Sequence, residues 1–252
     1  MQHFNDVKYL NQPNKDTSIC FACDNLYFQK YGQYTLKSCI NTDQIVHCHI
    51  INPSEESLIL ANKIKNNLVS ISVEDLDIEN LNKYQILTYY FCSRFFIARD
   101  LFEKYNVSSL WITDTDVWFN EKLEIPVDKK LCVDYNPTAD NLWKQTTGNI
   151  IFVHKDFQLF LTQVINEYLT RYNSTDFDKI SDNLDKITKS NLVGLDQVSM
   201  AVVIDKYYKS NPLFSTLSIF SNLKGKHKEG VKVWIPVGKS KDCVREHGFK
   251  YF

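Results

Sequence analysis

The chain of 252 residues is long enough for one large α/β domain or two small ones, and a hydrophobic content of 44% can supply a substantial core. These values exclude a disordered or fibrous protein. Lysine and arginine number 29 against 30 acidic residues, so the net charge of -1 provides no overall attraction to nucleic acid or to an anionic membrane.

Apolar strands and amphipathic helices alternate over the first half of the chain. The hydrophobic pattern predicts strands at 18–23, 44–51, 68–73 and 109–113, and helices at 25–41, 54–66 and 82–105. Strands that alternate with helices favour a doubly wound sheet with right-handed crossovers. The run 109–113 is short and largely apolar, which is typical of a central parallel strand that is covered on both faces.

Beyond Pro126 the pattern changes to shorter and less regular segments. It predicts strands at 131–135 and 149–153, helices at 156–172 and 194–208, and an exposed polar connection at 173–191. No convincing linker divides the chain. We therefore expect one domain over 1–252, with a nucleotide-binding half at about 1–125 and an acceptor-binding half at about 126–252.

Two aspartates stand at the end of the predicted central strand, in the sequence Asp114-Thr115-Asp116. Ligands of open parallel sheets bind at the carboxyl ends of the strands. Carboxylates one residue apart supply hard oxygen ligands for Mn²⁺ or Mg²⁺, and burying them between apolar segments is costly without a cation or another partner. We therefore expect Asp114 and Asp116 to bind a divalent metal.

The same spacing occurs twice more, in Asp75-Leu76-Asp77 and Asp176-Phe177-Asp178. Both copies lie among charged and helix-capping residues, which favours a solvated face or a helix N-cap. The motif at 114–116 is bracketed by apolar residues on both sides, and this context distinguishes it from the other two.

The segment 110–118, with the sequence Leu-Trp-Ile-Thr-Asp-Thr-Asp-Val-Trp, resembles the strand and D-x-D motif of retaining GT-A glycosyltransferases, and families 8 and 77 are the most similar. The resemblance extends over about residues 18–234. It implies a GT-A fold, which is a Rossmann-like α/β fold whose mixed, mainly parallel sheet has helices on both faces. It also implies a nucleotide-sugar donor, with a UDP-sugar favoured, and retention of the anomeric configuration.

Further segments are similar to the donor-binding elements of these families. Ile19 to Asp24 matches the strand before the nucleoside site, Tyr90 to Arg94 is similar to a Tyr-x-x-Arg pattern with one residue more, and Thr146-Thr147-Gly148 resembles a turn that carries Asn at its first position in the family. The donor-binding residues that the resemblance implies are Asp24, Asn25, Tyr27, Arg94, Thr115, Thr147, Gly148, Gly230 and Lys232.

Two more elements complete the resemblance. Gly194-Leu195-Asp196-Gln197 matches the family's Asp-Gln pair beside the anomeric carbon, which implies catalytic roles for Asp196 and Gln197; the alternative for Asp196 is a helix-start residue that interacts with the helix dipole. The segment 227–232 is similar to a His-x-x-Gly-x-x-Lys element, with one residue fewer. It implies that His227 is the third metal ligand, and the alternative is a solvated lysine-rich loop.

The implied reaction transfers a sugar from a nucleotide-diphosphate donor to an acceptor hydroxyl. Whether Asp196 or Gln197 acts as a nucleophile or stabilises an oxocarbenium-like ion stays open. One competing function is a haloacid-dehalogenase-like phosphatase, although Trp118 stands where that family has Thr or Val. The other is a nucleotide-sugar-binding module without catalysis.

The acceptor and the location of the protein are less constrained. Trp143, Tyr135 and the segment 173–191 are candidates to line a pocket for a glycan, a protein or a modified nucleic-acid base. Residues 1–16 are polar and no stretch has the about 18 consecutive apolar residues of a membrane span. Seven cysteines scattered through apolar segments are typical of reduced thiols, so we expect a cytoplasmic protein, or one of the host cytoplasm if the source is viral.

Overall fold

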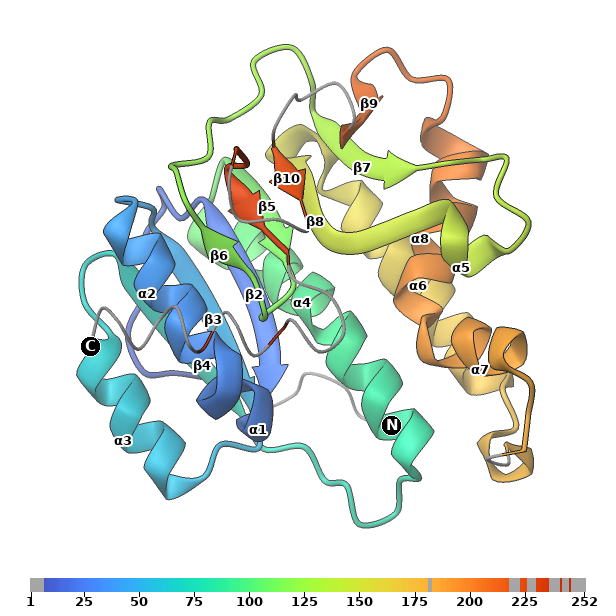
Figure 1. Cartoon of the computed structure of the whole chain (residues 1–252), viewed down its shortest axis with the longest axis horizontal. Coiled ribbons are helices and arrows are strands. Elements are labelled where there is room, and N and C mark those ends of the chain that lie inside the picture. The colour runs from blue at the N-terminus through green and yellow to red at the C-terminus, as the bar shows by residue number, and fades with distance from the viewer. Residues whose placement is uncertain are drawn as a thin grey trace.

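A computed structural model describes residues 7–180, 183–217, 223–225, 230–235, 241 and 245. An eight-stranded mixed sheet runs through the molecule in the order β1-β4-β3-β2-β5-β8-β7-β9 (Figure 1). Its strands are β1 Lys8–Tyr9, β2 Ile19–Asp24, β3 Val46–Ile51, β4 Val69–Glu74, β5 Ser109–Thr113, β7 Leu131–Tyr135, β8 Thr146–His154 and β9 Phe214–Thr216. A second, three-stranded sheet is formed by β6 Trp118–Phe119, β10 Lys224–Gly225 and β11 Val233–Trp234.

The centre of the large sheet changes direction at β5. Strands β4, β3, β2 and β5 are parallel neighbours, whereas β8 pairs with β5 and with β7 in antiparallel fashion. The four parallel neighbours β4, β3, β2 and β5 come from the first half of the chain, and the antiparallel pairs of β8 bring in the second half. The loop after β5 therefore lies where the two parts of the sheet meet.

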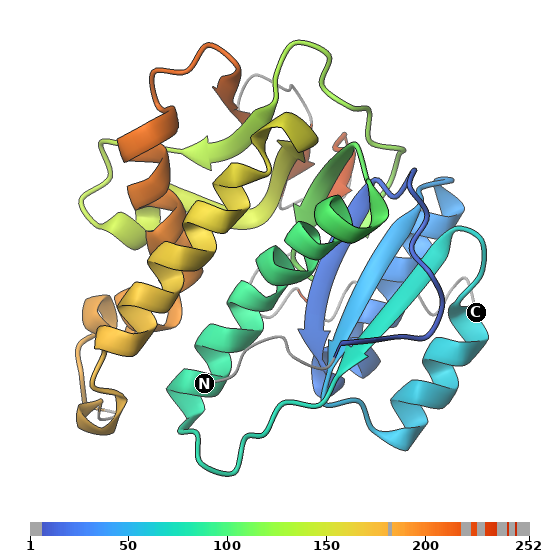
Figure 2. The same ribbon diagram turned by 180° about the vertical axis from the view of Figure 1, so that it is seen from behind.

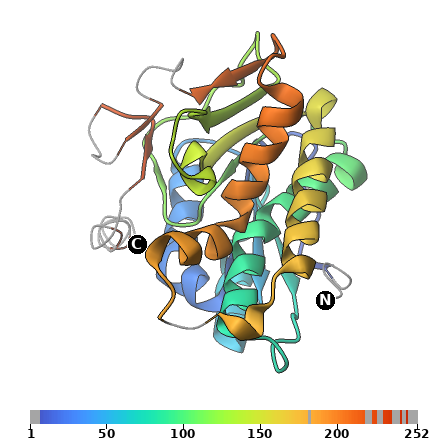
Figure 3. The ribbon, with the colours of Figure 1, turned by 90° about the vertical axis from the view of Figure 1, so that its right-hand side faces the viewer.

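Helices cover both faces of the large sheet, as predicted. Figures 2 and 3 show α4 and α6 side by side on one face, with α8 next to α6, whereas α2 and α3 lie on the opposite face. The helical elements are α1 Asn25–Tyr27, η1 Phe28–Gly32, α2 Gln33–Asn41, α3 Glu55–Ile64, α4 Lys83–Tyr105, α5 Leu142–Gln145, η2 Lys155–Phe157, α6 Leu159–Ser174, η3 Phe177–Lys179, α7 Lys186–Val193, α8 Leu195–Val203 and η4 Ile204–Tyr208.

Strand alternation divides the apolar side chains between two cores. In β2, Ile19 and Phe21 belong to the core beneath α2 and α3, and Cys20 belongs to the core beneath α4, α6 and α8. Cys23 joins the core with Ile19, so Cys20 and Cys23 point to opposite faces. No described helix is both long and apolar enough to cross a membrane.

Local signals in the sequence define the ends of the long helix α4. The Asn82 side chain accepts hydrogen bonds from the backbone N–H groups of Tyr84 and Gln85, and the Gln85 side chain accepts one from the Asn82 N–H, which forms a capping box. The helix ends at Asn106, whose φ of 55° is left-handed. This helix carries Arg94 to the sheet centre.

A chain of buried polar side chains connects β3 to β4 and α4. His47 contacts the hydroxyls of Ser70 and Ser72 at 2.8 Å each, and the two nitrogens of His49 contact Ser72 at 2.9 Å and Glu74 at 3.1 Å. Burial, reinforced by the neighbouring His49, lowers the pKa of His47 to about 3. His47 is therefore neutral in the folded protein at neutral pH.

From β6 onward the chain differs from its prediction in several places. The segment 173–191 is not a continuous polar connection, because it contains η3 and most of α7. Asp185 starts α7 by accepting hydrogen bonds from the N–H groups of Ile187 and Thr188 at 2.8 and 2.9 Å. The short strands β6, β10 and β11 have too few residues to produce a periodic signal, so the small sheet was not predicted.

Candidate active site

The loop after β5 is fixed by hydrogen bonds to the elements around it. The Thr115 hydroxyl donates to the backbone oxygen of Ala22 at 2.9 Å, and the Thr35 hydroxyl donates to that of Val117 at 2.8 Å. These bonds attach the loop to β2 and α2. Asp114 and Asp116 consequently emerge from the carboxyl end of the central strand in defined positions, and Asp114 is 34% exposed.

Arg94 of α4 connects two aspartates that are far apart in the sequence. Its guanidinium donates to Asp114 and, at 2.6 Å, to Asp196 at the start of α8. Burial lowers the pKa of Arg94, but the two carboxylates outweigh burial and the net shift is upward. Burial raises the pKa of Asp196, and Arg94 opposes that shift only in part. The arrangement holds three charged groups together at the junction of the two halves of the chain.

Gly148 of β8 lies directly against this cluster. A Cβ atom added there would be 2.3 Å from Arg94 Nη2 and 3.3 Å from Asp196 Oδ2. A side chain at this position would therefore occupy the space of the guanidinium. The neighbouring Thr146 hydroxyl donates to the Gln197 backbone oxygen at 2.8 Å, which attaches the start of α8 to the same strand.

Asp116 has a different cationic partner. The Lys241 ammonium lies 2.5 Å from Asp116 Oδ2. Burial raises the pKa of Asp116 and Asp114 adds to the rise, while Lys241 opposes it without cancelling it. Lys241 was not predicted as a site residue, because it belongs to none of the motifs that the sequence offers and only the tertiary structure brings it to the strand end.

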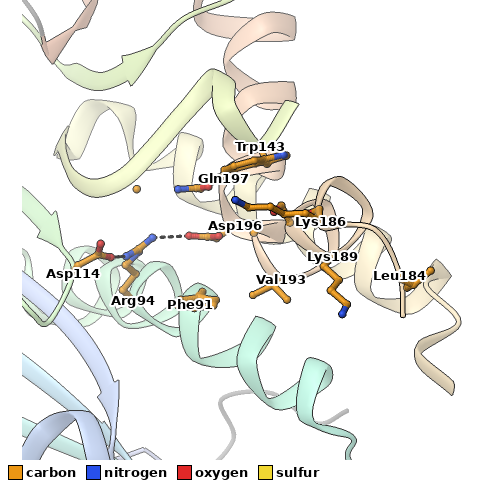
Figure 4. A pocket seen from close by; sticks show the side chains of 13 residues that line it. Phe91, Arg94, Asp114, Trp143, Leu184, Lys186, Lys189, Val193, Asp196 and Gln197 are labelled. Carbon is orange, nitrogen blue, oxygen red and sulfur yellow. Dashed lines mark hydrogen bonds and ion pairs between the residues drawn. The ribbon is translucent and has the colours of Figure 1, made fainter. Parts of the chain in front are cut away.

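Two cavities meet at the Arg94 cluster. The smaller cavity has a volume of about 180 Å³ and the larger a volume of about 560 Å³, and both are lined by Phe91, Arg94 and Asp114. The smaller cavity is further lined by Ala22, Cys23, Asp24, Tyr27, Leu87, Tyr90, Thr115, Asp116 and Lys241. The larger cavity (Figure 4) is further lined by Trp143, Gly148, Leu184, Lys186, Lys189, Ser190, Val193, Gly194, Asp196 and Gln197.

The cavities divide the predicted site residues into two groups. Asp24, Tyr27, Thr115 and Asp116, predicted for the nucleoside, diphosphate and metal, line the smaller cavity. Asp196, Gln197 and Gly148, predicted for the sugar, line the larger one. Arg94, predicted for the donor, and Asp114, predicted for the metal, line both cavities.

Some predicted donor residues have other partners. The Asn25 side chain accepts a hydrogen bond from the Ser54 N–H at 2.8 Å, at the start of α3. The Thr147 hydroxyl donates to Asp134 at 3.0 Å, and Lys224, part of the predicted basic cluster, donates to the same carboxylate at 2.7 Å. Asn25 thus joins α1 to α3, and Thr147 joins β8 to β7; neither residue is among the described residues that line the two cavities.

Residues of the predicted diphosphate element are placed elsewhere or are not described. Lys232 lies 4.0 Å from Glu124, and Gly230 is exposed; neither is among the described residues that line the two cavities. Their donor roles stay predictions. His227 lies outside the described residues, so its role as a metal ligand also stays a prediction.

The other two D-x-D segments lie at the surface. Asp77 accepts a hydrogen bond from the Glu79 N–H at 3.1 Å, and Asp75 lies 3.9 Å from Lys8. Asp176, 52% exposed, pairs with Lys179. The strand context therefore identified the one buried copy correctly.

The predicted pocket residues also separate. Trp143 and part of the segment 173–191 line the larger cavity, whereas the Tyr135 hydroxyl donates to Asp205 at 3.2 Å and does not line it. Phe91, which is shared by both cavities, was missed as a site residue. Its position three residues before Arg94 on α4 was the signal, since residues three apart lie on the same helix face.

Comparisons with known proteins concern the fold. No protein-family model and no curated protein sequence matches the chain. Among solved structures, the chain is similar to the glycosyltransferase GlyE of Streptococcus pneumoniae, with a TM-score of 0.51 and 10% sequence identity. The match covers 92% of this chain and 60% of that protein. This likeness confirms the predicted fold class, a mixed α/β fold of the glycosyltransferase type.

Proposed function

We propose that the protein is a metal-dependent glycosyltransferase that moves a sugar from a nucleotide-diphosphate donor, favoured to be a UDP-sugar, to an acceptor hydroxyl with retention of configuration. The observation that supports this most is the position of Arg94. It bridges Asp114 and Asp196 and lines both the smaller and the larger cavity. A donor that spans the two cavities has its diphosphate beside Asp114 and its sugar beside Asp196.

Each group of residues then has a chemical task. Asp24 and Tyr27, which line the smaller cavity, bind the nucleoside, while Arg94 and Lys241 supply positive charge to the departing diphosphate. Asp196 and Gln197 lie at the anomeric carbon, where a carboxylate stabilises the positive charge that develops as the bond to the leaving group breaks. The acceptor enters from the larger cavity. Its hydroxyl proton passes to the departing phosphate or to the Asp196 carboxylate.

The residues at the end of β5 fit a divalent metal. Mg²⁺ commonly uses one or two carboxylates together with substrate phosphates and water, so Asp114 and Asp116 are a sufficient protein contribution even without His227. Asp114 is accessible from both cavities and Asp116 from the smaller one. When bound, Mn²⁺ or Mg²⁺ supplies additional positive charge to the leaving diphosphate. Without a metal, Arg94 pairs with Asp114 and Lys241 pairs with Asp116.

A screen of UDP-sugars with Mn²⁺, read by mass spectrometry for hydrolysis or transfer, tests the proposal. The expected result is release of UDP. Release of inorganic phosphate from simple esters instead identifies a phosphatase, and binding of a nucleotide sugar without any turnover across a broad acceptor panel identifies a binding module. Either of these results overturns the proposed transfer.

A pair of matched substitutions tests the site. Asp116→Asn should abolish metal-dependent hydrolysis of the donor, because the substitution removes a negatively charged metal ligand. Asp77→Asn makes the same chemical change in an exposed D-x-D and should have no effect. Equal activity of Asp116→Asn and the wild type would show that the site is assigned to the wrong residues.

A further inference from the structure

The larger cavity has a separation of charge along its length. At one end the Arg94 guanidinium is already bonded to two carboxylates, those of Asp114 and Asp196. At the other end α7 contributes Lys186 and Lys189. Figure 4 shows the order Asp114, Arg94, Asp196 and then the Lys186 amino group, which extends from α7 toward Asp196, whereas Lys189 points away from it.

Lys186 has no carboxylate to neutralise it among the described residues. The nearest acid in the sequence, Asp185, already accepts hydrogen bonds from the N–H groups of Ile187 and Thr188 and from the Thr188 hydroxyl at 2.6 Å. Those bonds lower the pKa of Asp185 and commit its carboxylate to the start of α7. Among the described residues, then, the exposed Lys186 lines the cavity as a positive charge that no carboxylate neutralises.

The rest of the cavity wall suits a saccharide. The indole of Trp143 lies on one side, and Phe91 and Val193 lie across from it (Figure 4). Aromatic walls with a few convergent polar groups are typical of small-ligand pockets, and the volume of about 560 Å³ is within their usual range. The space accommodates one or two sugar rings rather than a folded macromolecule.

We propose that the larger cavity binds an acceptor saccharide that carries a phosphate or carboxylate group, and that Lys186 selects this group. The proposal rests on the proposed function, because it assigns the acceptor of that reaction. Lys186 attracts an anionic group, whereas the Arg94 guanidinium at the other end is already bonded to two carboxylates. This difference places the anionic group toward α7 and leaves a hydroxyl of the acceptor toward Asp196.

The position of Lys186 separates acceptor from donor. The donor reaches the larger cavity from the side of Asp114, and Lys186 lies on the opposite side of Asp196. An anionic group on the acceptor can therefore meet Lys186 without displacing the diphosphate. A donor sugar that is a uronate would also bring a carboxylate to Lys186. UDP-glucuronic acid is therefore compared with UDP-glucose in a separate measurement.

The test uses the full chain, the UDP-sugar that the wild type hydrolyses, and matched acceptors: glucose against glucose 6-phosphate, and galactose against galacturonic acid. Transfer is scored by mass spectrometry, and binding of the same compounds in the presence of UDP and Mn²⁺ is measured by calorimetry. We expect the wild type to prefer the anionic member of each pair. Lys186→Met should reduce that preference about tenfold or more, since a charged hydrogen bond is lost.

Two variants serve as controls. Lys186→Arg keeps the charge and should retain most of the preference. Lys179→Met makes the same change in net charge at a side chain that is 84% exposed and outside the cavity, and it should leave the preference unchanged. Thermal unfolding of each variant shows that it is folded.

Several results would overturn the proposal. The first is that the wild type uses and binds neutral and anionic acceptors equally. The second is a preference for anionic acceptors that Lys186→Met does not reduce. The third is that Lys186 determines a preference for the donor UDP-glucuronic acid over UDP-glucose. Failure of the wild type to hydrolyse any UDP-sugar defeats the proposed function instead. In that case binding of glucose 6-phosphate over glucose still decides whether Lys186 selects an anion.

Discussion

Gly148→Ala tests whether the position of the Arg94 guanidinium controls activity. The added Cβ would be 2.3 Å from Arg94 Nη2, and ordinary contact begins at 3.4 Å, so the guanidinium must move by about 1 Å. Such a shift is enough to break its 2.6 Å hydrogen bond with Asp196. The backbone of Gly148 is not in the left-handed region, so alanine can adopt its conformation and the effect comes from the contact.

The magnitude follows from that displacement. A misplacement of about 1 Å at a reacting centre can cost about 100-fold in rate, and overpacking of this kind destabilises a fold by about 1–3 kcal/mol. We therefore expect kcat for donor hydrolysis to fall about 100-fold while the protein stays folded. The assay is UDP release under saturating donor, together with thermal unfolding monitored by circular dichroism.

Ile151→Val on the same strand provides the matched control. Ile151 is fully buried, and loss of one methyl group there costs about 0.5–1.5 kcal/mol. It should lower stability and leave kcat unchanged. If Gly148→Ala has the kcat of the wild type, or if Ile151→Val reduces kcat to the same extent, the guanidinium position does not control the reaction.

Three other perturbations have defined outcomes. The pKa of His47 in the folded state, about 3, is below the unfolded value of 6.5, so the unfolded chain takes up the proton first and stability falls as pH drops from 6.5 toward 3. Urea unfolding should show a loss of about 2 kcal/mol between pH 7 and pH 5, and His47→Gln should remove most of that dependence; an unchanged pH slope would contradict the reasoning. Asn82→Ala removes the capping box of α4 and should cost about 1 kcal/mol of unfolding free energy, and a stability equal to that of the wild type would show that the cap is dispensable. Lys241→Met removes the cation beside Asp116 and should weaken UDP binding about tenfold in calorimetry, whereas an unchanged Kd would exclude Lys241 from the donor site.

The sequence predicted the part of the fold in which successive strands and helices pack against each other. Strands β2 to β5 and their helices follow directly from hydrophobic periodicity, and the predicted bounds of 109–113 match β5. The buried Asp114-Thr115-Asp116 was separated from two identical spacings because its flanking residues are apolar. A sequence therefore indicates that a strand end is buried when the residues on both sides of it are apolar.

Contacts between distant segments could not be predicted in the same way. Arg94 was assigned to the donor, but its bond with Asp196 spans 102 residues and leaves no trace in spacing. Lys241 reaches Asp116 from a segment without periodicity, and the start of α7 depends on the Asp185 cap within a stretch that reads as polar. Charge pairing depends on three-dimensional proximity, which a single sequence does not contain.

The bond between Arg94 and Asp196 has a consequence for the order in which the protein assembles. Arg94 and Asp114 are 20 residues apart and can pair once α4 and β5 have docked, whereas Asp196 must close a loop of 102 residues. A nascent chain that has folded only its first half has the strand end and its guanidinium but lacks the second carboxylate. The sugar-facing side of the cluster is therefore completed last, when α8 docks onto β8.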